Sequence, residues 1–183
     1  MSLSVRSFPE LRNRLTATGR RVRVVVCRPA DAHTLQAVLE SVRLGFVHAL
    51  LVGEYDAATL AAAPAEVRAE VECVPAADAA DAMQRAVQLV HDGEGEVLMK
   101  GLVNSDDLLR HVLNKTYGLR PAGAVITHAS VVSLPGFDRL IVLSDVAVIP
   151  YPTLEQRAAQ LDYTIALSRT LGTACPRVAL LHC

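Results

Sequence analysis

The sequence predicts an α/β fold in which a parallel sheet is flanked by helices, followed by the beginning of a second α/β domain. Short β-rich runs alternate with longer helical segments as far as residue 114, which is the pattern of strand–helix–strand units. The chain has 183 residues and 51% of them are hydrophobic, enough for one core and part of a second. After residue 122 two strand-like runs follow each other directly. We therefore expect a first domain over residues 1–122 and an incomplete second domain over residues 123–183.

The first domain is expected to hold four parallel strands with helices between them. Val-rich and other apolar runs predict buried strands at residues 22–27, 47–52, 70–74 and 96–100. Helices are expected near residues 8–18, 32–44, 56–63, 76–91 and 105–114. Asp31 is expected to cap the second of these helices, whose buried face would carry Leu35, Val38, Leu39 and Val42.

The second part of the chain has a different pattern. Residues 124–134 and 139–146 are β-rich and are joined by the turn sequence PGFD (135–138), which predicts a hairpin-like connection. The sequence TLEQ (153–156) is a capping box, so a long helix is expected from there to Gly172. The run RVALL (177–181) is expected to be a further buried strand.

Composition argues against nucleic-acid and membrane partners. The chain has 18 basic and 19 acidic side chains, a net charge of −1 and no Trp, whereas such partners require a clear basic excess on one face. The N-terminal sequence has no apolar run typical of a signal peptide, and no run is long enough to span a bilayer. We expect a cytoplasmic protein without a metal site, because no C-x-x-C pair occurs among Cys27, Cys73, Cys175 and Cys183.

The segment with the clearest chemical signal follows the fourth predicted strand. Lys100 ends that strand, at the sheet edge where open α/β sheets bind ligands. Gly101 allows the chain to turn, and Asn104 or Ser105 is expected to cap the next helix. The unsatisfied N–H groups at that helix start favour an anion. Three further cations follow within a short stretch, and such a cluster suits a phosphate or an acyl phosphate: Arg110, Lys115 and Arg120.

Each of these residues also has an ordinary structural explanation. Lys100 is equally typical of the solvated end of a strand. Asp106 and Arg110 have the i,i+4 spacing of a surface ion pair. Asp106 and Asp107 also stabilise the helix N-terminus, where they compete with a bound anion.

Three segments resemble the phosphate acetyltransferase/phosphate butyryltransferase family. VLMKGLVNSDDLLRHVLNKTYGLR (97–120) resembles the central motif of that family. PGFDRLIVLSDVAV (135–148), followed by PTLEQRAAQ (152–160), is similar to the family's next block. The run ending in ALLVG (49–53) fits its opening strand–helix–strand unit. The resemblance extends over residues 22–181 and is greatest to the butyryl branch.

The resemblance implies two α/β domains of the isocitrate/isopropylmalate dehydrogenase type, with an active site in the cleft between them. It implies transfer of an acetyl, butyryl or similar acyl group between coenzyme A and inorganic phosphate through an acyl phosphate. Coenzyme A would then be a substrate, no covalently bound cofactor is expected, and a homo-oligomer such as a dimer is expected. The residues that would bind substrate at the cleft are Lys100, Asn104, Ser105, Arg110, His128, Ser144 and Asp145.

Members of the family are longer than this chain. The resemblance implies that their C-terminal segment completes the second domain and supplies a Ser-Arg pair and an acidic group to the active site. This sequence has no residues that match those positions, so no catalytic residue or general base is assigned. We expect a chain that lacks the C-terminal part of the family: a fragment, a truncated form or a degenerate gene product.

Three alternatives remain open from the residues themselves. A dinucleotide enzyme would need a glycine-rich turn after the first strand, but the chain reads Arg28-Pro29-Ala30-Asp31 there. A non-catalytic ligand-binding or assembly module would be favoured by an uncovered 177–181 strand and an exposed sheet edge. A nucleophilic enzyme would need a Cys or Ser beside a His; of the candidates only His128 follows a strand, and Cys27 is expected to be buried and inert.

Overall fold

The computed structural model describes residues 4–181, so the predicted free thiol of Cys183 lies outside the described residues. The chain divides into two compact units. We call residues Leu15–Pro121 the sheet unit, and the residues up to Arg14 together with those from Ala122 onward the hairpin unit. The prediction had grouped the first 14 residues with the sheet. They group instead with the hairpin unit, where the Val5 N–H donates to the Leu171 carbonyl at 2.8 Å.

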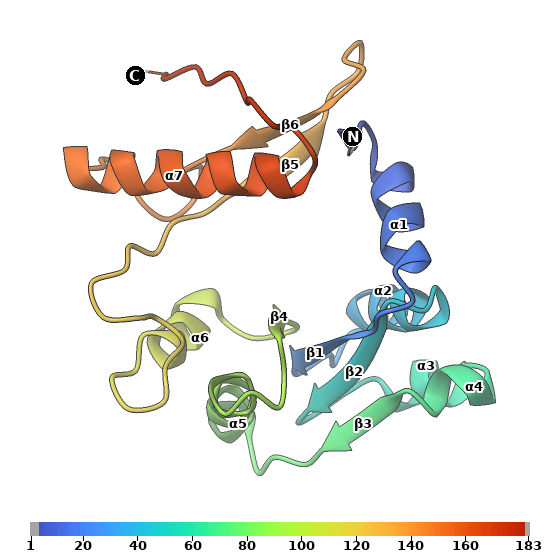
Figure 1. The fold of residues 1–183 in the computed structure, drawn as a ribbon. Coiled ribbons are helices and arrows are strands. Elements are labelled where there is room, and N and C mark those ends of the chain that lie inside the picture. Colours follow the sequence, from blue (N-terminus) through green and yellow to red (C-terminus); the bar gives the residue numbers. More distant parts are fainter. Residues whose placement is uncertain (1–3, 182–183) are drawn as a thin grey trace. The chain divides into compact units, whose positions relative to one another are not determined.

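The sheet unit is built on four parallel strands, as predicted. They are β1 (Val22–Cys27), β2 (Val47–Val52), β3 (Val71–Val74) and β4 (Val97–Lys100), in the order β3-β2-β1-β4 (Figure 1). Because all pairs are parallel, the four carboxyl ends lie at one edge of the sheet. The order itself, with β4 joining on the far side of β1, could not be read from the alternation of strands and helices.

Helices cover both faces of this sheet, because alternate residues of the central strands point to opposite sides. One face packs against α2 (Ala32–Arg43), through a cluster formed by Val26, Leu51, Leu35, Val38, Leu39 and Val42. The other face packs against α5 (Ala79–His91) and α6 (Ser105–Val112), through Val25, Cys27, Leu50, Val52, Met83, Val87 and Leu108. The predicted core face of α2 is confirmed in full.

Carboxylate caps fix the starts of α2 and α5 in the sheet unit. Asp31 accepts from the Thr34 N–H at 2.8 Å at the start of α2, as predicted. Asp78 accepts from the Asp81 N–H at 2.9 Å, so α5 begins at Ala79 and not at the predicted residue 76. The weak helix expected at 56–63 is α3 (Ala57–Ala62), and a further single-turn helix follows it, α4 (Ala65–Arg68).

The hairpin unit contains α1 (Phe8–Ala17) up to Arg14, an antiparallel pair and one long helix. β5 (Ser130–Ser133) pairs with β6 (Leu140–Leu143), which confirms the predicted hairpin. Its turn begins with a hydrogen bond from the Phe137 N–H to the Leu134 carbonyl at 3.1 Å, with Gly136 at φ 83°. Pro then Gly at these central positions is the sequence of a type II turn.

Helix α7 (Leu154–Thr170) begins at the predicted capping box. The Thr153 hydroxyl accepts from the Gln156 N–H, and the Gln156 side chain accepts from the Thr153 N–H at 2.8 Å. Its end near Gly172 also agrees with the prediction. No helix within residues 4–181 combines the length and the apolar character that crossing a membrane requires.

One predicted strand is wrong. Residues 177–181 form no strand in the structure, and Leu180 and Leu181 are 75% and 81% exposed. A strand needs a neighbouring backbone ladder, and a strand this apolar also needs a covering layer. Within the described part of the chain neither is present at this segment.

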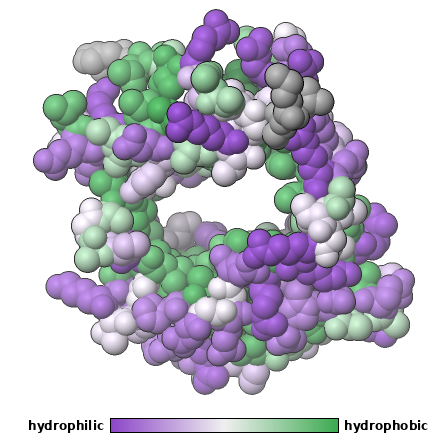
Figure 2. Space-filling model, viewed as in Figure 1, coloured by the Kyte–Doolittle hydropathy of each residue, from purple (hydrophilic) through white to green (hydrophobic). Residues whose placement is uncertain are grey.

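Hydrophobic residues are distributed very differently in the two units. Among the described residues every buried hydrophobic side chain except Val5 lies in the sheet unit. The hairpin unit instead exposes large apolar side chains, and Figure 2 shows hydrophobic colour reaching the surface over α7 and the C-terminal segment. The most exposed are Tyr151, Leu154, Leu180 and Leu181. Two strands, one long helix and the first part of α1 bury too little apolar surface to form a core of their own.

Candidate functional site

The carboxyl edge of the parallel sheet holds the first group of predicted site residues. Lys100 is the last residue of β4 and lies opposite Cys27, the last residue of β1. Its side chain is exposed at this edge, and its Nζ donates to the Gly101 carbonyl at 3.3 Å. The prediction that a strand delivers Lys100 to the carboxyl edge of the sheet agrees with this geometry.

Gly101 brings the exits of β4 and β1 into direct contact. Its N–H donates to the Cys27 carbonyl at 2.9 Å, and the next N–H, of Leu102, donates to the Arg28 carbonyl at 2.8 Å. A Cβ on Gly101 would lie 2.4 Å from the Arg28 carbonyl oxygen. Only glycine therefore fits here without movement of the backbone.

Helix α6 starts immediately after this contact. Asn104 is its cap, and its Oδ1 accepts from the N–H groups of Asp106 and Asp107 at 2.8 and 3.3 Å. Ser105 is the first helical residue and is exposed. The cap satisfies two of the free N–H groups, and the adjacent Asp106 carboxylate repels anions. The start of α6 alone is therefore a weaker anion-binding site than the sequence suggested.

Arg110 lies away from the start of α6. It is in the last turn of the helix, its side chain is 77% exposed, and it donates to Asp107 Oδ1 at 2.6 Å. The i,i+4 ion pair between Arg110 and Asp106 that the spacing indicated does not form, because Arg110 pairs with Asp107, three residues before it. Lys115 and Arg120 are exposed beyond the helix. Within the sheet unit, the structure places Lys100, Asn104 and Ser105 at the carboxyl edge and Arg110 at the opposite end of α6.

The sequence prediction missed Arg28. This residue follows β1 directly and has a positive φ of 53°. Its guanidinium forms an ion pair with Glu54, just beyond β2, and donates to the Leu102 carbonyl at 3.3 Å. Its position directly after a parallel strand was the available signal, because such positions lie at the carboxyl edge of the sheet.

The charges at this edge act on the thiol of Cys27. Burial raises the pKa of Cys27 to about 11, and the neighbouring cations Arg28 and Lys100 offset only part of that increase. Cys27 is fully buried. It is therefore a protonated core side chain at neutral pH, as the sequence predicted, and not a nucleophile.

The remaining predicted site residues come together in the hairpin unit. The Asp145 carboxylate accepts from the Thr127 hydroxyl at 2.6 Å and from the His128 N–H at 3.0 Å. It also accepts three further backbone N–H groups, those of Ala147, Val148 and Ile149. Partial burial would raise the pKa of Asp145, but these hydrogen bonds outweigh it and hold that pKa well below 3.8. Asp145 is thus a structural anion that organises the chain after β6.

Two polar atoms beside Asp145 have no partner in the structure. They are Nδ1 of His128 and the hydroxyl of Ser144, and both are buried. The other ring nitrogen of His128 is 3.5 Å from the Ser130 hydroxyl. Buried polar atoms without partners are uncommon in folded proteins, so these two groups are available for a bound molecule or water.

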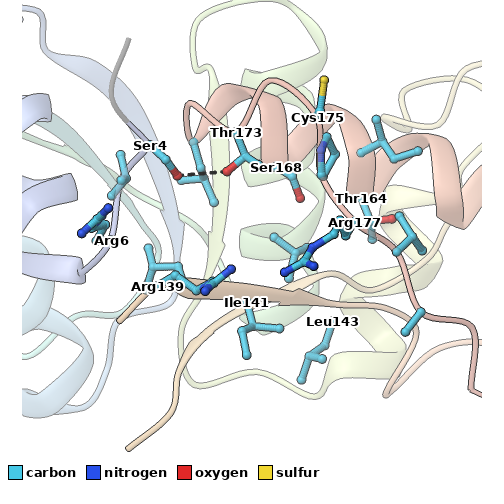
Figure 3. A pocket seen from close by; sticks show the side chains of 18 of the residues that line it. Ser4, Arg6, Arg139, Ile141, Leu143, Thr164, Ser168, Thr173, Cys175 and Arg177 are labelled. Atoms are coloured by element: carbon cyan, nitrogen blue, oxygen red, sulfur yellow. Dashed lines mark hydrogen bonds between the residues drawn. The ribbon is translucent and has the colours of Figure 1, made fainter. Parts of the chain in front are cut away.

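The hairpin unit also contains a pocket of about 660 Å³ (Figure 3). It is lined by the N-terminal segment, β6, α7 and the residues after Thr173, and Ser4 and Thr173 form a 3.0 Å hydrogen bond at its wall. Arg139 and Arg177 are among its lining residues. None of the predicted site residues lines it.

Comparison with known proteins identifies the family. The family model described as "Phosphate acetyl/butaryl transferase" matches residues 71–183, which include the 97–120 motif and the Asp145 loop. The chain belongs to this family. A phosphate butyryltransferase from Clostridium acetobutylicum is 32% identical over 96% of the chain, and a phosphate acetyltransferase from Thermotoga maritima is 29% identical over 90%.

A solved structure supports the fold. A branched-chain phosphotransacylase from Enterococcus faecalis V583 superposes with a TM-score of 0.68 at 20% identity, over 83% of this chain and 52% of that one. The chain spans 58% of the Clostridium relative and 55% of the Thermotoga relative.

Proposed function

We propose that this chain takes part in acyl transfer between coenzyme A and inorganic phosphate, through an acyl phosphate. The family match over residues 71–183 is the observation on which the proposal rests. The relatives whose names describe phosphate butyryl and acetyl transfer support the same reaction class. The cytoplasm is the proposed location, and acyl-coenzyme A and phosphate are the proposed partners.

The chemistry asks three things of the site. The thiol of coenzyme A loses its proton to solvent or to the departing phosphate, its sulfur attacks the carbonyl carbon of the acyl phosphate, and the C–O bond to phosphate breaks to release phosphate. The site therefore has to orient the two substrates, stabilise charge on the carbonyl oxygen and hold the phosphate. Lys100, Asn104 and Ser105 at the carboxyl edge are proposed to hold the phosphate. Within the hairpin unit, His128, Ser144 and Asp145 are the proposed substrate-binding residues, and the two buried polar atoms without partners support that role.

The proposal is tested by release of thiol from acetyl-, butyryl- and longer acyl-coenzyme A in the presence of phosphate. Phosphate-dependent release that Lys100→Ala weakens would support it and would rank the acyl groups. Arg110→Ala tests whether that exposed cation takes part. Release that does not depend on phosphate would contradict the proposal.

A second proposal has a separate observation behind it. The hairpin unit exposes Tyr151, Leu154, Leu180 and Leu181 and has almost no buried apolar residues of its own among those described. Such a surface favours a ligand-binding or assembly module, and a homo-oligomer such as a dimer. Light scattering during size-exclusion chromatography of the wild type and of a Leu154→Asp, Leu180→Asp variant distinguishes a monomer from an assembly through this surface.

A further inference from the structure

Arg28 is held in an unusual conformation by bonds on both sides. Its N–H donates to the Val52 carbonyl of β2 at 2.9 Å, and its carbonyl accepts from Leu102 after β4 at 2.8 Å. The residue is nevertheless left-handed, at φ 53°, which a non-glycine residue adopts only infrequently. Within the described residues it is the one non-glycine residue with a positive φ. Residues in such conformations cluster at binding sites.

This conformation turns the Arg28 side chain across Gly53. A Cβ built on Gly53 would lie 3.6 Å from Cγ of Arg28 and 2.8 Å from the Cβ of Ala82 in α5. The stem of Arg28 therefore packs along Gly53 at ordinary van der Waals distance, and the close approach that excludes a side chain at Gly53 is the one by Ala82 of α5. The side chain is 28% exposed, and its head reaches Glu54 and the Leu102 carbonyl.

Lys100 lies at the same edge, one strand away. It ends β4 opposite Cys27, and the charges of both Arg28 and Lys100 lower the pKa of the Cys27 thiol against the larger effect of burial. Guanidinium and ammonium groups are the usual cations of a phosphate site, the first donating two parallel hydrogen bonds and the second acting as a point charge, and these two side chains leave neighbouring strands at the same edge.

We propose that Arg28 and Lys100 form a phosphate-binding pair at the carboxyl edge of the sheet, and that Glu54 holds the Arg28 guanidinium until a phosphate group displaces it. The inference deepens the proposed function and rests on it for the source of the phosphate, which is either inorganic phosphate or a phosphate of coenzyme A. Glu54 lies beyond the end of β2, and its side chain is 64% exposed. It is therefore a replaceable partner, because exposed ion pairs contribute little stability.

Substitutions of Arg28 and of Glu54 are expected to change phosphate affinity in opposite directions. In calorimetric titration of the full chain with inorganic phosphate, Arg28→Ala weakens binding about tenfold because two charge-assisted hydrogen bonds are lost. Glu54→Gln tightens binding about threefold because the competing carboxylate is removed. The matched control is Arg85→Ala, an arginine that forms an ion pair with Asp81 on the exposed face of α5, and it leaves phosphate affinity unchanged.

A purely structural ion pair predicts a different result. In that case Arg28→Ala and Glu54→Gln would both lower the melting temperature, and they would not shift phosphate affinity in opposite directions. That result would overturn the inference. If Arg28→Ala fails to fold, the phosphate affinities of Arg28→Lys and Glu54→Gln test the inference instead. Arg28→Lys keeps the charge but loses the two-pronged donor, so we expect weakened binding of about threefold.

Two further measurements identify which phosphate group Arg28 binds, and distinguish phosphate binding from acyl transfer. Titration with coenzyme A and with its analogue lacking the 3′-phosphate shows whether Arg28 recognises that group or inorganic phosphate. Phosphate binding that depends on Arg28, without any thiol release, would contradict the proposed acyl transfer and support the anion site. Acyl transfer and phosphate affinity both unaffected by Arg28→Ala would support the reaction and overturn the site.

Discussion

The backbone N–H of His128 donates to Oδ2 of Asp145 at 3.0 Å, across 17 residues of sequence. This bond ties the chain two residues before β5 to the loop after β6. It also accounts for part of the shortening of the first predicted run, 124–134, because the His128 N–H bonds to the Asp145 carboxylate and not to a neighbouring strand, and β5 begins only at Ser130. The second predicted run, 139–146, ends as a strand at Leu143, and Asp145 within it accepts the N–H groups of residues 147–149 instead of joining the hairpin.

Asp145→Asn is expected to loosen this loop and destabilise the hairpin unit by about 2 kcal/mol. An amide has one acceptor oxygen where the carboxylate has two, and its NH₂ group would face N–H donors. Hydrogen exchange of the Ala147, Val148 and Ile149 amides measures the effect. Asp138→Asn is the control, because the ion pair between Asp138 and Arg139 is 3.5 Å long and exposed. This variant should change the free energy of unfolding by less than about 0.5 kcal/mol. Equal exchange in both variants would contradict the structural role of Asp145.

Gly101→Ala tests the contact between the exits of β1 and β4. The added Cβ would lie 2.4 Å from the Arg28 carbonyl oxygen, so the backbone must move. We expect a loss of about 3 kcal/mol in the free energy of unfolding, together with weaker phosphate binding. Gly93→Ala is the comparison: no atom lies within 4 Å of its added Cβ, and only its φ of 80° is unfavourable, for about 1 kcal/mol. Urea denaturation of the two variants measures the difference, and equal losses would refute the close contact.

Cysteine alkylation tests the burial of Cys27. Its pKa is raised to about 11 by burial and it is fully buried. At pH 8 we expect Cys73 and Cys175, which are exposed, to react with iodoacetamide much faster than Cys27. Mass spectrometry of peptides after partial labelling measures the order. Rapid labelling of Cys27 in folded protein would show that the sheet edge opens.

The pH dependence of stability is expected to involve His48 and Glu70. A hydrogen bond from His48 lowers the pKa of Glu70 below its ordinary value of 4.5, with a smaller contribution from the charge of Arg21. Because the folded-state pKa is depressed, the stabilisation is present above pH 4.5 and is lost as the pH falls through the lower folded-state value.

Glu70→Gln removes this titration. The melting temperature of the variant should therefore fall less steeply than that of the wild type as the pH is lowered from 5 to 3. Parallel curves for the two proteins would show that the His48 bond does not couple to folding.

The sequence was informative where local chemistry decides structure. The four parallel strands, the Asp31 cap, the α7 capping box and the PGFD turn each depend on a short run of residues, and all are confirmed. It was less informative where distant segments decide. The position of β4 beside β1 and the grouping of the first 14 residues with the hairpin unit depend on contacts across most of the chain.

The candidate site shows the same division. Lys100 and Asn104 could be placed at the carboxyl edge because a strand, a glycine and a cap follow one another in the sequence. Arg28 could not be predicted, since its direction depends on a positive φ and on contacts with Glu54 and Leu102 from two other strand exits. The hydrogen bond between Asp145 and His128 could not be predicted either, because it joins two segments that only the hairpin brings together.

The most direct measurement is detection of the acyl phosphate itself. Folded chain is incubated with butyryl-coenzyme A and inorganic phosphate, and the products are followed by phosphorus NMR together with free thiol. The account predicts butyryl phosphate and thiol in equal amounts, with a rate that Lys100→Ala lowers. No acyl phosphate from a folded sample, with butyryl- or acetyl-coenzyme A, would contradict catalysis by this chain and would leave the binding or assembly module as its function.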